Sequence, residues 1–208
     1  ACQFSTWNDG LSNLPSTLPA GCVLMLSDET PICGHDPQRI LWELQECIAR
    51  FSCRALVLDF QRPGNQEAEE LIPFLVTLTC PLVVSLPYVR DNCGVLLPPA
   101  PLSTSLEDYL SPWRGREIWM ELALDGEILT LTEQGAKPIP LPYPNLGTEG
   151  FRDDALHCHY RTQLTDTCAE FTLWRTMDDL RDLIKEAETL GCTAVMGLYQ
   201  ELYSTEKL

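Results

Sequence analysis

Short apolar runs alternate with amphipathic stretches along the first half of the chain. The clearest run is residues 55–58, and an unbroken apolar run of this length is typical of a strand buried on both faces. Before it we expect a helix that Asp36 caps and Pro37 opens, with apolar residues at helical spacing up to residue 51. After it, residues 65–79 also have a helical pattern. A strand between two helices predicts a parallel sheet of βαβ units.

Seven further runs have the length and composition of strands. They are residues 3–7, 22–26, 82–88, 94–98, 117–124, 156–163 and 193–199. Helical patterns are also found over residues 104–113 and 176–190. The order predicts an α/β fold: a small, incomplete (β/α)₈ barrel of the TIM type, formed as one domain by residues 1–208, in which loops and hairpins replace some outer helices. An open, doubly wound sheet is the alternative.

The second half of the chain contains hairpin signals. Asp125-Gly126 predicts a tight turn after the strand over 117–124, with residues 128–132 as the returning strand. Residues 168–173 are a candidate hairpin partner for residues 156–163. Four prolines fall within residues 137–145, which predicts a surface loop or extended arm.

Composition excludes some classes of function. The 208 residues are 45% hydrophobic, enough for a real core, and the net charge of −16 argues against binding nucleic acid or anionic membranes through electrostatics. Residues 71–89 contain no charge and are long enough to span a bilayer. Three prolines interrupt that segment, and the pattern fits a helix end and a buried strand, so we expect no membrane span.

Ten cysteines occur, several within apolar runs and without a CxxC pair. This pattern predicts reduced, mostly buried thiols and a cytoplasmic protein. Export after removal of a signal segment is the alternative.

Three segments resemble glycoside hydrolase family 18, the chitinase-like barrels, and most closely the branch of spore-cortex and peptidoglycan N-acetylglucosaminidases. They are Leu58-Asp59-Phe60-Gln61 followed by Pro63, then Val84-Ser85-Leu86-Pro87, and residues 190–198, together about a fifth of the chain. The resemblance implies a barrel in which the sugar's acetamido group attacks, an aspartate orients it and a final glutamate protonates the leaving oxygen.

This chain departs from the family at the positions that matter for catalysis. The two earlier acidic positions are Arg54 and Val57, only Asp59 is kept, and the general acid is replaced by Gln61. An amide does not supply that proton, and losing general acid–base help typically costs about 10²–10⁴-fold in rate. The resemblance therefore implies a catalytically impaired barrel that binds an N-acetylglucosamine-containing glycan, with Asp59 and Gln61 at the former catalytic positions.

Other polar and aromatic residues are expected at the same mouth, because they follow the predicted strands. The candidates for substrate binding are Trp7, Asp28, Tyr88, Tyr199 and Glu201. Two alternatives stay open. The first is an active glycosidase with relocated carboxylates, drawn from Asp28, Asp59, Asp91 and Glu201. The second is a non-enzymatic interaction module that uses the Pro-rich arm over 137–144.

His157-Cys158-His159 is the remaining distinctive motif. On a strand both histidines face one side, where Glu121, or Cys33 with His35, would complete a zinc site. The spacing of known zinc sites is absent, so we expect hydrogen-bonded structural histidines, no metal and no cofactor. No GxSxG elbow, phosphate-binding glycine loop or basic stripe is present, and the oligomeric state stays open.

Overall fold

A computed structural model describes residues 2–7, 10–12, 16–28, 36–141 and 146–198. The chain divides into two compact units, one formed by residues 1–97 with 115–119 and the other by residues 98–114 with 120–208. The organisation as one domain over residues 1–208 stays a prediction.

The first unit is built on a mostly parallel sheet. Its strands are β1 (Cys2–Trp7), β2 (Gly10–Ser12), β3 (Val23–Ser27), β4 (Ala55–Asp59), β5 (Leu82–Ser85), β6 (Gly94–Leu97) and the start of β7 (Ile118–Leu122). The hydrogen-bonding order is β7-β6-β5-β4-β3-β1-β2. Strands β1, β3, β4, β5 and β6 pair in parallel, while β2 returns antiparallel to β1. The α/β class is thereby confirmed, whereas closure into a barrel stays a prediction.

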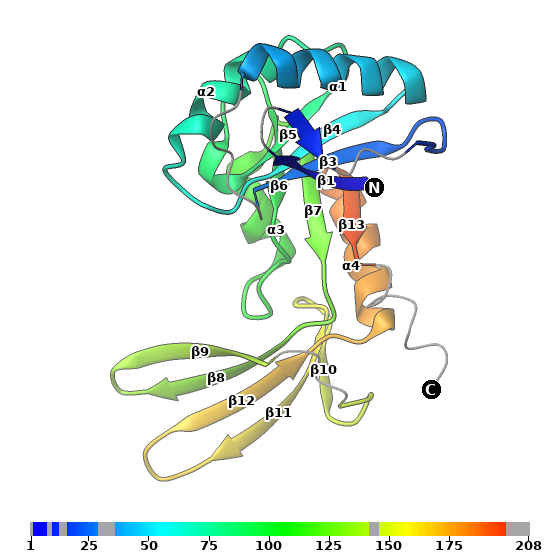
Figure 1. Ribbon diagram of the computed structural model, residues 1–208. Helices are drawn as coiled ribbons and strands as arrows, with labels where there is room; N and C mark the ends of the chain where they lie inside the picture. The colour runs from blue at the N-terminus through cyan, green and yellow to red at the C-terminus, as the bar shows by residue number, and fades with distance from the viewer. Residues whose placement is uncertain (1, 8–9, 13–15, 29–35, 142–145, 199–208) are drawn as a thin grey trace. The chain divides into compact units, whose positions relative to one another are not determined.

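Two helices, α1 (Pro37–Phe51) and α2 (Gln66–Leu75), lie on one face of this sheet (Figure 1). The predicted cap of α1 is present, since the Asp36 carboxylate accepts a hydrogen bond from Gln38 N at 3.0 Å. The buried face of α1 is Ile40, Leu44, Cys47, Ile48 and Phe51. It packs against one face of β3, β4 and β5, in a core cluster with Leu24, Leu26, Leu56, Leu58, Leu82 and Val84. The alternate residues of these strands, Met25, Val57 and Val83, are buried as well.

The connection between β5 and β6 is short, as the sequence predicted. The expected strand over residues 82–88 ends at Ser85, and a 3₁₀ turn, η1 (Leu86–Tyr88), follows with Pro87 at its start. No helix joins these two parallel strands, because the turn and the loop to Gly94 are enough.

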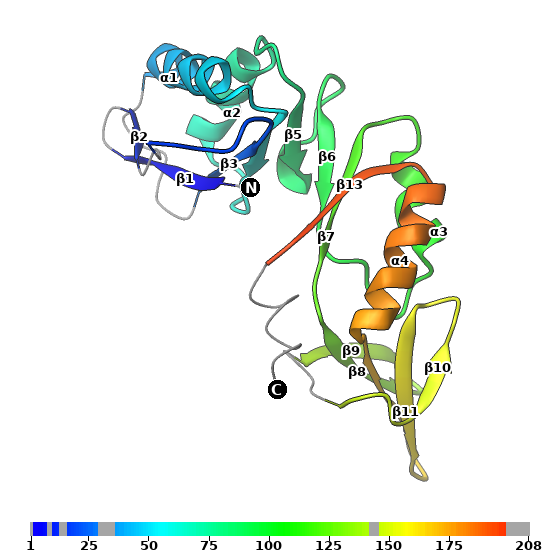
Figure 2. The same ribbon diagram turned by 90° about the vertical axis from the view of Figure 1, so that its right-hand side faces the viewer.

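The second unit contains a five-stranded antiparallel sheet in the order β10-β11-β12-β8-β9. Its elements are α3 (Leu106–Leu110), η2 (Ser111–Trp113), β8 (Gly126–Thr132), β9 (Gly135–Leu141), β10 (Phe151–Asp153), β11 (Cys158–Leu164), β12 (Ala169–Trp174), α4 (Met177–Thr189) and β13 (Cys192–Gly197). Figure 2 shows α4 beside β10 and β11. The predicted hairpin partners β11 and β12 do pair, with Thr162 opposite Phe171.

Two expectations for this half of the chain are wrong. Residues 128–132 do not return along β7, because β8 pairs with β12 and β9 instead. The strand expected over 156–163 belongs to the antiparallel sheet rather than to the parallel one.

The surface loop or extended arm expected over 137–145 is an extended, mostly exposed strand in its described part, residues 137–141 of β9, and residues 142–145 lie outside the described residues. An edge strand tolerates Pro138 and Pro140, because its outer side needs no hydrogen-bond donors.

In the part of the chain that the structure describes, no helix has both the length and the apolar character needed to cross a membrane. The uncharged residues 71–89 are shared among α2, β5 and η1.

Candidate functional site

The predicted site lies at the carboxyl ends of β3, β4 and β5, which are adjacent in the sheet. Ser27 is opposite Asp59 in the register of β3 and β4. The hydroxyl of Ser85, at the end of β5, donates to the Leu58 carbonyl at 2.9 Å. Parallel strands bring their carboxyl ends to one edge, so residues distant in sequence gather there.

Asp28, directly after β3, holds the start of the loop between β4 and α2. Its side chain is 3% exposed, and its two carboxylate oxygens accept hydrogen bonds from the backbone N–H groups of Gln61 and Arg62, both at 3.0 Å. Hydrogen bonds to a charged group are the stronger kind. Asp28 therefore fixes where Gln61 stands at the end of β4.

Asp59 and Gln61 form a hydrogen-bonded pair in this setting. Asp59 is half-buried and Gln61 is exposed, and the Gln61 side-chain amide donates to Asp59 Oδ1. The pair offers a carboxylate acceptor and an amide that both donates and accepts. This chemistry suits hydroxyl and acetamido groups.

Tyr88, in η1, anchors the same loop from the β5 side. Its ring is 2% exposed and meets Phe60 edge-on, with centroids 5.9 Å apart and an interplanar angle of 88°. The hydroxyl donates to the Arg62 carbonyl and accepts from Asn65 N at 3.2 Å, and burial raises the pKa of Tyr88. The ring thus packs in the core instead of offering a face to a sugar.

The other predicted site residues are placed as follows. Trp7 ends β1, but its side chain is outside the described part, and Tyr199 and Glu201 lie outside the described residues altogether. Asp91 has a side chain that is 98% exposed and pairs with Arg116 at 3.1 Å. The structure therefore brings together Asp28, Asp59, Gln61 and Tyr88, and it adds Asn65, whose role as the α2 cap was readable from the helix pattern.

The two histidines of the 157–159 motif are occupied by carboxylates of α4. His159 Nδ1 lies 2.8 Å from Asp179 Oδ2, and His157 Nε2 meets Glu186. His157 precedes β11 and has φ of +48°, so the expected strand alternation begins only at Cys158. Within the described residues, no group of three or more potential ligands is arranged to hold a metal ion.

Sequence reasoning missed the centre of this network, Asp179, which is fully buried. Burial alone would raise its pKa, but hydrogen bonds from Thr176, Arg152 and His159 outweigh it and lower the Asp179 pKa below its usual range. The sequence does contain a pattern that marks Asp179, because Thr176 and Asp179 have the spacing of a capping box at the start of α4.

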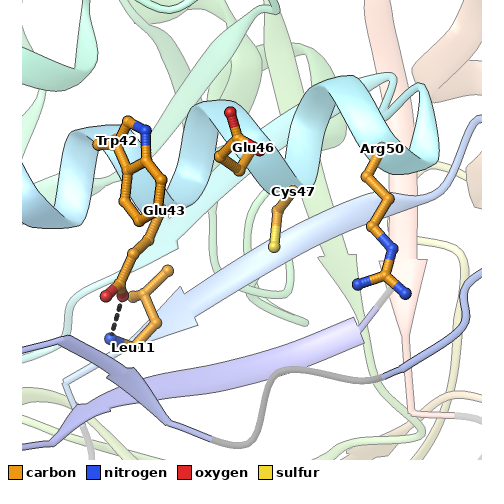
Figure 3. A pocket seen from close by; sticks show the side chains of 6 residues that line it. All are labelled: Leu11, Trp42, Glu43, Glu46, Cys47 and Arg50. Atoms are coloured by element: carbon orange, nitrogen blue, oxygen red, sulfur yellow. Dashed lines mark hydrogen bonds between the residues drawn. The ribbon is translucent and has the colours of Figure 1, made fainter.

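A separate hollow lies between α1 and β2 (Figure 3). Its volume is about 310 Å³, and it is lined by Leu11, Trp42, Glu43, Glu46, Cys47 and Arg50. Trp42 is 59% exposed, as its place off the apolar face of α1 would suggest. Glu43 accepts hydrogen bonds from Leu11 N at 2.7 Å and from Arg39 at 3.1 Å, so this carboxylate ties β2 to α1. Of the predicted site residues whose side chains the structure describes, none lines this hollow.

No family model and no curated protein matches the chain, but solved structures do. The spore cortex-lytic enzyme SleL of Bacillus cereus aligns with a TM-score of 0.55 at 10% identity, over 94% of this chain and 62% of that one. The chitinase-like agglutinin of Robinia pseudoacacia aligns with a TM-score of 0.51 at 13% identity, over 88% of this chain and 79% of that one. The SleL of Bacillus megaterium aligns at 12% identity with a TM-score of 0.46, over 84% of this chain and 55% of that one.

At such identities the likeness concerns the fold alone. The chain shares the fold of chitinase-like and cortex-lytic proteins, in agreement with the family that its sequence resembles. It spans less than two thirds of the length of either cortex-lytic enzyme.

Proposed function

We propose that this chain binds an N-acetylglucosamine-containing glycan without hydrolysing it, at the carboxyl ends of β3, β4 and β5. The observation that carries the proposal is the Asp59–Gln61 pair at the end of β4. In the family that the sequence resembles, the position that Gln61 takes here holds the glutamic acid that protonates the leaving oxygen. The fold likeness supports the glycan class, and the Robinia protein is an agglutinin despite its chitinase-like character.

The proposed contacts follow from the chemistry of the pair. Asp59 accepts a hydrogen bond from the acetamido N–H of the sugar, and the Gln61 amide bonds a neighbouring hydroxyl or carbonyl. Asp28 and Tyr88 do not touch the glycan. They act as positioning residues, because their hydrogen bonds hold the backbone at Gln61, Arg62 and Asn65.

An active glycosidase with relocated carboxylates has less support. Both oxygens of Asp28 already accept backbone hydrogen bonds, and protonating this carboxylate would weaken the loop it holds. The Asp91 side chain is 98% exposed, and its carboxylate is paired with Arg116 at 3.1 Å. The interaction module built on residues 137–144 stays a hypothesis, with residues 137–141 now placed in β9.

Calorimetric titration with N-acetylglucosamine oligomers tests the proposal. We expect saturable binding by the wild type, affinity at least tenfold weaker in Asp59→Asn, and no released reducing ends. Asp91→Asn is the matched control, because it removes an exposed carboxylate in the same unit and should leave affinity unchanged. Absence of saturable heat at millimolar ligand would overturn the proposal, and hydrolysis by the wild type would support the relocated-carboxylate alternative.

A further inference from the structure

Two thiols touch at the opposite, amino-terminal ends of the same strands. Cys22 directly precedes β3, and Cys53 lies two residues before β4. Their sulfur atoms are 3.6 Å apart, although the residues are separated by 31 positions in sequence. Both are unbridged in the structure. Contact between two sulfurs leaves only a short movement to the bond length of a disulfide.

The turn after α1 brings the two sulfur atoms together. Arg54 N donates to the Cys22 carbonyl at 2.8 Å, which continues the pairing of β3 with β4. Cys53 is therefore one position beyond the residue opposite Cys22 and lies outside β4. On a continuous strand this offset would point the two side chains to opposite faces of the sheet. The turn, in which Ser52 has φ of +51°, departs from the strand pattern, and the sulfur atoms lie 3.6 Å apart.

The two thiols differ in access, and burial makes Cys53 a weak acid. Cys22 is half-buried, whereas Cys53 is 8% exposed and directs its thiol at the Cys47 carbonyl, 3.7 Å away. Burial, together with the hydrogen bond to Cys22 and the nearby thiols, raises the pKa of Cys53 to about 12. A soluble reagent therefore reaches Cys22 first, and Cys53 reacts from inside as the slower partner.

We propose that Cys22 and Cys53 form a reversible disulfide by exchange with a small-molecule disulfide of the glutathione class. The Cys22 thiolate attacks one sulfur of the reagent, whose S–S bond breaks and releases one thiol. The Cys53 thiolate then attacks the Cys22 sulfur of the mixed disulfide and releases the second thiol. The two protein thiols are oxidised to one disulfide, and the reagent is reduced to two thiols that take up the two protons.

The bond would join the start of β3 to the turn after α1. It would close a loop of 31 residues that contains β3 and α1. The loop-length relation for disulfides predicts a rise in the unfolding temperature of about 7–14 °C for a chain of this size. This site is independent of the proposed glycan site, which lies at the other ends of the strands.

The test incubates the folded protein with oxidised glutathione, blocks remaining thiols by alkylation and maps linked peptides by mass spectrometry. We expect a single major link, Cys22–Cys53, with a rate that rises about tenfold per pH unit between pH 7 and 9, because Cys53 is mostly protonated there. Cys22→Ser should lack the link and the rise in unfolding temperature. Cys168→Ser, which removes a half-buried thiol in the other unit, should keep both.

Specific outcomes would overturn the inference. The first is that Cys22 and Cys53 stay unlinked in the folded wild type, although the same reagent has fully oxidised a small dithiol added to the reaction. The second is that Cys22 is linked to Cys47, Cys53 and Cys80 in equal amounts. The peptide map of the wild type decides the matter even if a serine variant does not fold. No glycan is present in this assay, so its result is separate from that of the titration.

Discussion

Replacing Asp28 with alanine removes the two hydrogen bonds that hold the loop after β4. Each joins a backbone N–H to a charged oxygen at 3.0 Å. Such bonds contribute about 1.5–3 kcal/mol each, so full loss would cost about 3–6 kcal/mol. The two N–H groups are only partly buried, so hydrogen bonds to water replace part of the lost interaction. We therefore expect the free energy of unfolding to fall by about 2–4 kcal/mol.

Urea unfolding measures this loss. With a slope of about 2 kcal/mol per M, the midpoint of the first unit should fall by about 1–2 M in Asp28→Ala. Asp59→Ala is the control, because this half-buried carboxylate accepts its hydrogen bond from the exposed Gln61 side chain, and its loss should cost under about 1 kcal/mol. Equal midpoints for Asp28→Ala and the wild type would refute the view that Asp28 holds this loop.

Three further variants, one of them with a matched control, test other contacts. Tyr88→Phe should destabilise by about 1–2 kcal/mol in urea unfolding, since it removes two hydrogen bonds to the loop backbone, and an unchanged midpoint would argue against the anchor. Gly150→Ala should lower the free energy of unfolding by about 2–4 kcal/mol, because an added Cβ would lie 2.8 Å from the Tyr160 carbonyl oxygen at a φ of +126°. Its control, Gly147→Ala, has open space around the added Cβ and should lower that free energy by about 1 kcal/mol. Asp179 has a lowered pKa, so the stability it contributes is complete above about pH 4 and lost as pH falls through its folded pKa. The difference in unfolding free energy between wild type and Asp179→Asn should therefore shrink as the pH falls below about 4, and a difference that keeps its pH 4 value down to pH 2 would contradict this.

The parallel sheet could be predicted because its strands have one simple signal. Strands β3, β4 and β5 are buried on both faces, so each is a short, almost wholly apolar run between caps and turns. The cluster at their carboxyl ends followed from the same topology, and Asp28 and Asp59 lie where it placed them. The role of Asp28 could not be predicted, because it depends on two backbone N–H groups more than 30 residues away.

The antiparallel sheet was harder to predict because its pairing is not local. Gly126 looks like a turn residue beside Asp125, yet it lies opposite Trp174 and Leu141 in a register set by strands far away in sequence. The polar run Arg161-Thr162-Gln163 was a usable warning, since a strand buried on both faces rarely carries three polar residues in succession. Those residues are exposed on β11.

Amide chemical shifts recorded during a titration with an N-acetylglucosamine tetramer test the central claim most directly. The account predicts saturable shifts centred on residues 27–28 and 59–62, at the carboxyl ends of β3 and β4, with the tetramer recovered intact. Shifts confined to other strands or to the second unit, or no shifts at millimolar ligand, would contradict the proposed glycan site.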